Sequence, residues 1–279
     1  MMMKFDFRES AKDHILVVAH RGMPGGNIPC NTIPAYEMAL QQGADMIEID
    51  VTMGKEGTLY IFHPSMEPHH LNSTRYIPDM TDAEIQELRY VNYDRVPTQF
   101  GLNRFDELLE MFKGRCYINV DKFWDHPKEI YQVIKRHDMI DQIVVKSGPS
   151  DEVFRVLEDL APELPFMPIV RDTNPVHEEL KRRNINYLGA EVLFAEDTAE
   201  VASPTFLEMM HRDDKLVWAN AIIYNYKSQL TGGHSDDTAV CGDPESGWGW
   251  LAKRGFDLIQ TDWPGPLVNY LKEKDLYKR

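Results

Sequence analysis

The feature that most constrains the fold of this chain is the regular alternation of short apolar runs with segments of helical pattern. The apolar runs read as strands, and most are apolar on both faces, as in parallel strands that are covered on both sides. The predicted strands are 15–19, 45–50, 58–63, 115–121, 142–146, 166–170, 187–192, 216–221 and 257–261.

The segments between these strands carry helix start and stop signals. Pro34 lies just inside a helix that ends before Gly43, and Thr81 with Glu84 forms a capping-box pattern. The other predicted helices are 105–112, 126–137, 151–160, 176–183, 205–212, 245–254 and one that begins near Pro266.

Nine strands are one too many for an eight-stranded barrel. The run 58–63 follows the preceding strand too closely for a parallel crossover, which normally takes a dozen or more residues. We therefore predict an α/β fold, a TIM-like (β/α)8 barrel that forms a single domain over residues 1–279, with an insertion after strand two at about 51–103. The longest loop-like stretch, 224–242, is a candidate lid.

The net charge and the number of cysteines limit the kinds of partner and compartment that we expect for this protein. The formal net charge of −15 disfavours nucleic acid and anionic membrane surfaces as partners. Three cysteines make no disulfide framework, and no run reaches transmembrane length. We expect a soluble cytoplasmic protein without membrane insertion, with a removed leader peptide as the alternative. The sequence does not fix the oligomeric state.

Polar residues gather where the predicted strands end, which is the face that carries the active site in such barrels. Glu48 and Asp50 share one face of strand two, and Asp121 ends the next barrel strand. Three converging carboxylates suit a hard divalent cation, Mg²⁺ or Ca²⁺. An ordinary solvated strand end is the alternative for Glu48 and Asp50.

His20 and His63 end two other strands and could act as an acid–base pair, because imidazole titrates near neutral pH. Arg21 and Lys146 offer positive charge to a phosphate group. Structural histidines and surface ion pairs are the alternatives for these four residues. The loop histidines at 69, 70 and 234 give a weaker metal pattern, since adjacent histidines do not easily face one ion.

These motifs together resemble the glycerophosphodiester phosphodiesterase family. The family pattern runs HRG, ENT, GAD-x-IE-x-DV, a Thr-x-Asp-Gly turn, HD, an acid on strand three and TD-x-P. The counterparts here are His20-Arg21-Gly22, Asn31-Thr32, the run 43–51 with Glu48 and Asp50, Glu56-Gly57, His63, Asp121 and Thr261-Asp262-Trp263-Pro264, and their order holds from about residue 16 to 272.

The resemblance implies a metal-dependent phosphoric diester hydrolase that acts on a small-molecule phosphodiester and yields glycerol 3-phosphate and an alcohol. It implies His20 and His63 as general acid and base, and Arg21 as the phosphate ligand. It also implies Glu48, Asp50 and Asp121 as ligands of one divalent cation. The alternatives are a lysophospholipase D- or phospholipase C-like enzyme and a catalytically weakened barrel that binds phosphodiesters.

The chain departs from the family pattern at three places. Cys30 replaces the Glu of ENT, and Pro64 replaces the Asp of HD, so Arg21 and His63 lose carboxylates that could orient them. Lys122 directly follows Asp121, whereas the family has its acid and lysine two residues apart.

Two explanations fit this spacing: the strand end bends to bring Lys122 to the site, or Lys146 supplies the cation. We favour Lys146. Glu191, Trp218 and Asn220 lie near later strand ends and could contact the substrate.

Overall fold

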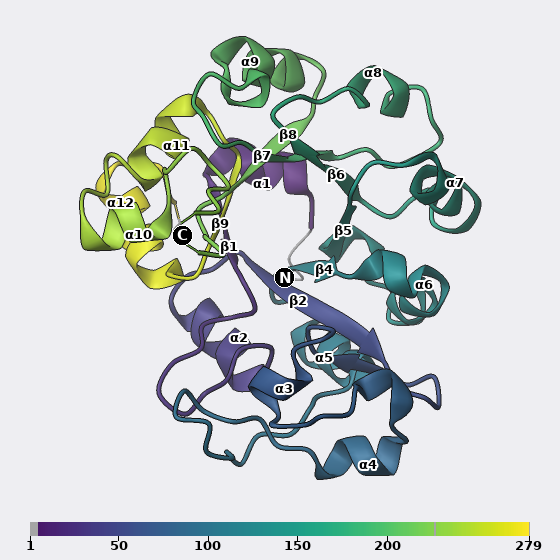
Figure 1. The fold of residues 1–279 in the computed structure, drawn as a ribbon. Coiled ribbons are helices and arrows are strands. Elements are labelled where there is room, and N and C mark those ends of the chain that lie inside the picture. The colour runs from purple at the N-terminus through teal and green to yellow at the C-terminus, as the bar shows by residue number, and fades with distance from the viewer. Residues whose placement is uncertain (1–4, 226, 279) are drawn as a thin grey trace.

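The computed structural model describes residues 5–225 and 227–278. Eight parallel strands form a closed barrel, because β1 pairs with both β9 and β2. Helices surround the barrel (Figure 1), which confirms the predicted (β/α)8 fold. The barrel strands are β1 (Leu16–Ala19), β2 (Met46–Met53), β4 (Tyr117–Asp121), β5 (Ile143–Ser147), β6 (Phe166–Arg171), β7 (Gly189–Leu193), β8 (Leu216–Asn220) and β9 (Leu258–Thr261).

The ninth strand lies outside the barrel, as predicted. β3 (Leu59–Ile61) pairs antiparallel with the end of β2, and Val51 lies opposite Ile61. The insertion continues through α3 (Glu67–His70) and α4 (Asp82–Glu87), and it packs around its own small apolar cluster. The chain then returns to the barrel through α5 (Phe105–Phe112).

Several helices begin at a residue whose side chain caps the first turn. Thr32 accepts a hydrogen bond from the backbone of Ala35, and the predicted Thr81–Glu84 capping box is present. Their apolar faces and the outward faces of the strands form the main core. The remaining helices are α2 (Ile33–Gln41), α6 (Pro127–Arg136), α7 (Asp151–Leu160), α8 (His177–Leu180), α9 (Pro204–Arg212), α10 (Asp236–Cys241), α11 (Trp248–Arg254) and α12 (Pro264–Glu273).

The barrel interior is apolar at its N-terminal end and polar at its C-terminal end. The lower layer includes Leu16, Met46 and Leu258, and Phe7 joins the same cluster. Phe7 belongs to α1 (Phe7–Asp13), a helix that sequence reasoning did not predict, and its ring lies 4.1 Å from that of Tyr117. α1 thus packs against the lower end, and the polar residues lie at the opposite rim, where the parallel strands end.

Three sequence expectations need correction. The stretch 224–242 is not a continuous loop, because α10 occupies Asp236–Cys241; its residue 226 lies outside the described residues. The helices predicted at 176–183 and 245–254 are the shorter α8 and α11. Within residues 5–225 and 227–278, no helix combines the length and apolar character needed to cross a membrane.

Candidate active site

Three carboxylates meet at the C-terminal rim of the barrel. Glu48 and Asp50 alternate on β2 and therefore point to the same side, and Asp121 on β4 is the register partner of Asp50. One ligand oxygen from each lies within 4.8 Å of the others. Glu48 and Asp50 are almost fully buried, at 2% and 0% exposure. The predicted convergence of these three side chains is present.

The electrostatics of this cluster fit a bound cation. Burial, followed by the negative charge of Asp50, raises the pKa of Glu48 to about 7. One oxygen of Asp50, Oδ1, is buried without a hydrogen-bond partner among the described residues. An all-oxygen set of three carboxylates suits Mg²⁺ or Ca²⁺, which would provide the missing positive charge.

His20 is held by a carboxylate whose role sequence reasoning did not assign. Nδ1 of His20 lies 2.8 Å from Oδ1 of Asp262, which follows β9. Burial lowers the pKa of His20, but the hydrogen bond to Asp262 and the charge of Glu48 outweigh it and raise the pKa above its usual value. The sequence signal that could have identified this partner is the Thr261-Asp262 pair directly after the last predicted strand.

Asp262→Asn is expected to lower the pKa of His20, because the substitution removes the negative charge at Nδ1. The limb of the pH–rate profile that reports His20 should then move to lower pH, and this can be measured from kcat/KM between pH 5 and 9. A profile that keeps the wild-type position would contradict this role for Asp262.

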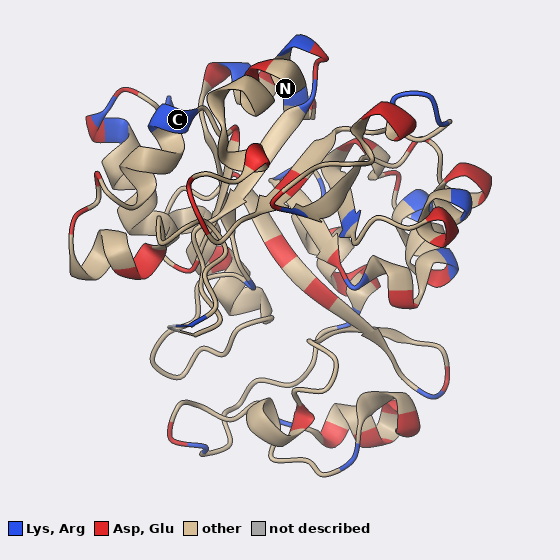
Figure 2. Cartoon of the chain, turned by 45° about the horizontal axis from the view of Figure 1, so that its top comes forward, with Lys and Arg blue, Asp and Glu red and all other residues tan. Residues whose placement is uncertain are grey.

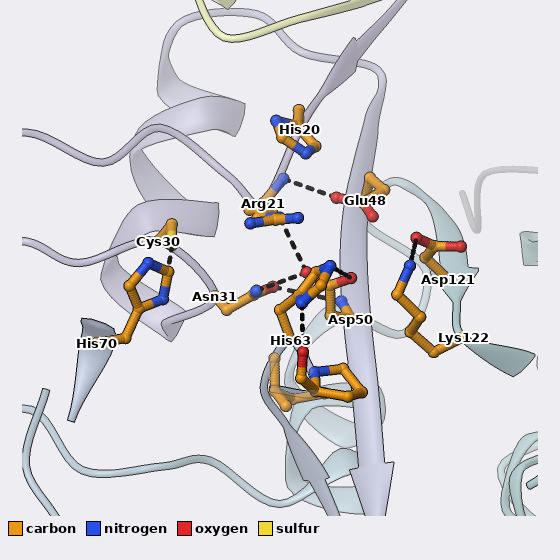
Figure 3. A network of polar contacts seen from close by, with 12 residues as sticks. His20, Arg21, Cys30, Asn31, Glu48, Asp50, His63, His70, Asp121 and Lys122 are labelled. Carbon is orange, nitrogen blue, oxygen red and sulfur yellow. Dashed lines mark hydrogen bonds and ion pairs between the residues drawn. The ribbon is translucent and has the colours of Figure 1, made fainter. Parts of the chain in front are cut away.

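His63 is oriented by a main-chain carbonyl in place of the missing carboxylate. Its Nδ1 lies 2.8 Å from the carbonyl oxygen of Pro64, to which it can donate its proton. The Nε2 atom lies 4.0 Å from Oδ1 of Asp50. Figure 3 shows the ring of His63 beside Asp50. Asp50 lies on β2, the strand that also carries Glu48. The structure therefore fixes the ring of His63 although Pro64 replaces the acid.

Arg21 lies between the two carboxylates of β2 (Figure 3). Its backbone N–H donates to Oε2 of Glu48 at 2.8 Å, and its Nε is 2.9 Å from Oδ2 of Asp50. The turn after β1 places Arg21 at φ 55°. Gly22 has φ 83°, and a Cβ there would lie 2.8 Å from the carbonyl carbon of Ala35, so this turn needs glycine.

Asn31 connects helix α2 to the acid cluster, a contact that sequence reasoning missed. Its Nδ2 donates to Oδ2 of Asp50 at 2.8 Å, and its Oδ1 accepts from the hydroxyl of Tyr36 at 2.8 Å. The neighbouring Cys30 has its Sγ 3.9 Å from Nδ1 of His70. Burial raises the pKa of the Cys30 thiol to about 12, so Cys30 stays protonated and acts as a neutral side chain.

The two lysines occupy different depths. The end of β4 bends at Lys122, which has φ 62°, and its Nζ is 2.9 Å from Oδ2 of Asp121. Lys122 thus reaches the acid cluster, contrary to the expectation that Lys146 would take this place. Lys146 is buried deeper, where it forms an ion pair with Glu191 and lies 4.0 Å from the centre of the Trp218 ring.

Within the described part of the chain, His69, His70 and His234 belong to neither group of clustered metal-ligand atoms. Nε2 of His234 is 2.9 Å from Asp197, and its ring stacks on Trp250. A second group with ligand atoms close together is formed by His177, Glu178 and Asp213. Lys181 already forms ion pairs with both acids of that group, because its Nζ lies 2.6 Å from Glu178 and from Asp213.

Asp236 holds the segment that carries Asp262. It is buried and accepts hydrogen bonds of 2.7 Å from Nε1 of Trp248, from the hydroxyl of Thr261 and from the backbone N–H of Asp262. The first residue of α10 therefore fixes the end of β9, and this supports the position of His20.

Asp236→Ala is expected to lower the free energy of unfolding by about 3 kcal/mol, because it leaves three buried donors without an acceptor. Urea unfolding followed by circular dichroism measures this change. The matched control is Asp237→Ala at the exposed neighbouring position, which should keep wild-type stability. Equal stabilities of the two variants would contradict the assignment.

Comparisons with known proteins agree with the site motifs. A family described only as a domain of unknown function (DUF4996) matches residues 166–271. A glycerophosphodiester phosphodiesterase of Bacillus subtilis is 27% identical over 179 residues, which span 57% of this chain and 60% of that protein. Another from Caldanaerobacter subterraneus is 41% identical over 133 residues, 48% of this chain and 46% of that protein. The chain thus aligns with only about half of the length of these relatives.

Solved structures show the same fold. A glycerophosphoryl diester phosphodiesterase from Parabacteroides distasonis superposes with a TM-score of 0.78 at 18% identity, and covers 98% of this chain and 94% of its own. A phosphodiesterase from Oleispira antarctica, solved with the product sn-glycerol-3-phosphate, superposes with a TM-score of 0.69 at 19% identity. The superposition covers 93% of this chain and 97% of that protein. The sequence relatives support the resemblance of this chain to glycerophosphodiester phosphodiesterases, and the solved structures show that it shares their fold.

Proposed function

We propose that the protein hydrolyses glycerophosphodiesters to glycerol 3-phosphate and an alcohol in a metal-dependent reaction. The observation that carries this proposal is the position of His20, Arg21 and His63 around the carboxylates of Glu48 and Asp50. The names of the sequence relatives support the same reaction class.

Glu48, Asp50 and Asp121 would hold one divalent cation, Mg²⁺ or Ca²⁺. When bound, such an ion neutralises charge on the phosphoryl oxygens. Arg21 lies beside the cluster and Lys122 at its other edge, so both can bind the same anionic group. The acidic protein thereby gains a local positive site for an anionic substrate.

His63 and His20 are placed for complementary proton transfers. With its Nδ1 proton donated to Pro64, His63 offers Nε2 as a base, whereas Asp262 favours the protonated form of His20 as an acid. In the first step the neighbouring glycerol hydroxyl attacks phosphorus and gives its proton to His63. The P–O bond to the alcohol breaks, and the alcohol takes a proton from His20.

The second step reverses these roles. Water attacks the cyclic phosphate and gives its proton to His20, which is now neutral. The ring P–O bond breaks, and the released glycerol oxygen takes the proton back from His63. Both histidines return to their starting states, and glycerol 3-phosphate is the product.

The deeper polar layer is the proposed site for the glycerol part of the substrate. Nδ2 of Asn220 donates to Glu191 at 2.5 Å, and Glu191 also pairs with Lys146. Oδ1 of Asn220 and Nε1 of Trp218 are buried and have no hydrogen-bond partner among the described residues. Hydroxyl groups can satisfy both atoms, since a hydroxyl donates and accepts.

Purified protein incubated with glycerophosphocholine tests the proposal. Release of glycerol 3-phosphate that stops with EDTA and returns with Mg²⁺ or Ca²⁺ is the expected result. Silence on a panel of diesters with Mg²⁺, Ca²⁺ or Mn²⁺ would overturn it and favour a barrel that only binds phosphodiesters.

One observation favours a lipid-tailed substrate as a second candidate. A cavity of about 350 Å³ beside the barrel rim is lined mainly by apolar side chains, among them Phe123, Trp124 and Val153. It also contacts Ser147, which follows Lys146 in the chain. Turnover of a lysophospholipid without turnover of glycerophosphocholine would support a lysophospholipase D-like activity.

We further propose that residues 1–279 act as one domain, in the cytoplasm, on a small molecule and without nucleic-acid partners. Acidic and basic residues are mixed over the outer helices, and acidic residues also lie on the long strand β2 (Figure 2). Such a distribution with a net charge of −15 disfavours a nucleic-acid backbone as a partner.

A further inference from the structure

A groove of about 830 Å³ adjoins the candidate active site on the side of the insertion. One wall comes from the loop after β1, including Cys30, and the other from the insertion, including His70 and Tyr90. In Figure 3, Cys30 and His70 lie on one side of Arg21, and Asp121 lies on the opposite side. The groove wall at Cys30 and His70 therefore lies across Arg21 from Asp121.

The inner end of the groove is continuous with the candidate active site. The hydroxyl of Tyr90 donates to the carbonyl oxygen of Asn31 at 3.3 Å, and the side chain of Asn31 donates to Asp50. Cys30 precedes Asn31 and lies beside His70. A diester whose phosphate lies at Arg21 can thus extend its second alcohol along this wall.

The insertion wall of the groove also includes an exposed aromatic ring and a carboxylate. Tyr93 is 97% exposed, and Asp94 is exposed with no ion pair or hydrogen bond from its side chain to the rest of residues 5–225 and 227–278. The guanidinium of Arg95 is turned to the carbonyl of Pro68 at 2.9 Å and to Oδ1 of Asn72 at 2.6 Å. The carboxylate of Asp94 is therefore left available to a ligand.

We propose that this groove receives the leaving alcohol of the diester, and that Tyr93 and Asp94 select a cationic head group of the quaternary ammonium type. The inference rests on the proposed phosphodiesterase function. An aromatic face and a carboxylate both attract a cation, and a quaternary ammonium has no N–H groups that would need acceptors. A neutral head group gains nothing from either residue.

The test compares glycerophosphocholine with glycerophosphoglycerol, whose head group is neutral. Asp94→Asn and Tyr93→Ser should each lower kcat/KM for glycerophosphocholine by about three- to tenfold, as expected for exposed charge and cation–π contacts. The kcat/KM for glycerophosphoglycerol should stay at the wild-type value. Added salt should weaken the preference of the wild type for glycerophosphocholine.

The matched control is Asp79→Asn, which removes an exposed charge from the same insertion outside the groove and should change neither substrate. If Asp94→Asn and Tyr93→Ser lower kcat/KM equally for both substrates, or for neither, the groove assignment is wrong. The proposed phosphodiesterase function would still stand. Loss of turnover only in Trp124→Ala would overturn it and point to the apolar cavity. A wild-type protein that cleaves no diester would overturn the proposed function itself.

Discussion

His20→Ala and His63→Ala are each expected to lower kcat for glycerophosphocholine by about 10²- to 10⁴-fold, the usual contribution of general acid–base catalysis. Each variant removes one of the two groups that transfer protons in both proposed steps. Neither imidazole belongs to the carboxylate cluster, so the affinity for Mg²⁺ or Ca²⁺ should change little. Steady-state kinetics and calorimetric titration of the metal measure the two quantities.

The matched control is His137→Ala, which removes a histidine at the C-terminal end of α6. This variant should keep the wild-type kcat. A His63→Ala protein that retains full kcat would contradict the proposed base. Loss of metal affinity in either catalytic variant would show that the imidazole contributes to the metal site, and the roles would need to be reassigned.

Glu48→Ala is expected to weaken metal binding by about 10²-fold or more, an effect at least as large as the loss of a residue that only supports a metal ligand. Glu48 supplies one of the three clustered carboxylates, and it also accepts the backbone N–H of Arg21. Calorimetric titration of Mg²⁺ and Ca²⁺ at pH 8, above the pKa of about 7 for Glu48, measures the affinity.

Glu110→Ala, at an exposed position of α5, is the matched control and should bind metal like the wild type. Unchanged affinity in Glu48→Ala would remove Glu48 from the ligand set. A thermal unfolding scan of both proteins without metal separates this effect from a loss of folding. Loss of the carboxylate relieves repulsion within the cluster but leaves the backbone N–H of Arg21 without its acceptor, so the scan shows whether Glu48→Ala stays folded at the temperature of the titration.

The barrel and much of its rim could be predicted from the sequence because they depend on local patterns. Two-sided apolar runs indicate parallel strands, and the short spacing before 58–63 identified β3 as the strand outside the barrel. The two-residue pleat placed Glu48 and Asp50 on one face, and the parallel pairing of β2 with β4 brought Asp121 beside them. These predictions needed only the period of a strand and the rule that parallel strands end at one rim.

The contacts that orient the site were decided by the tertiary structure alone. Asp262 reaches His20 across 242 positions of the chain, and Asp236 holds Asp262 through a helix that was predicted as loop. The bend at Lys122 and the carbonyl of Pro64 depend on backbone directions at strand ends. A sequence pattern gives the period of an element, but long-range packing sets the path of the chain after the element ends.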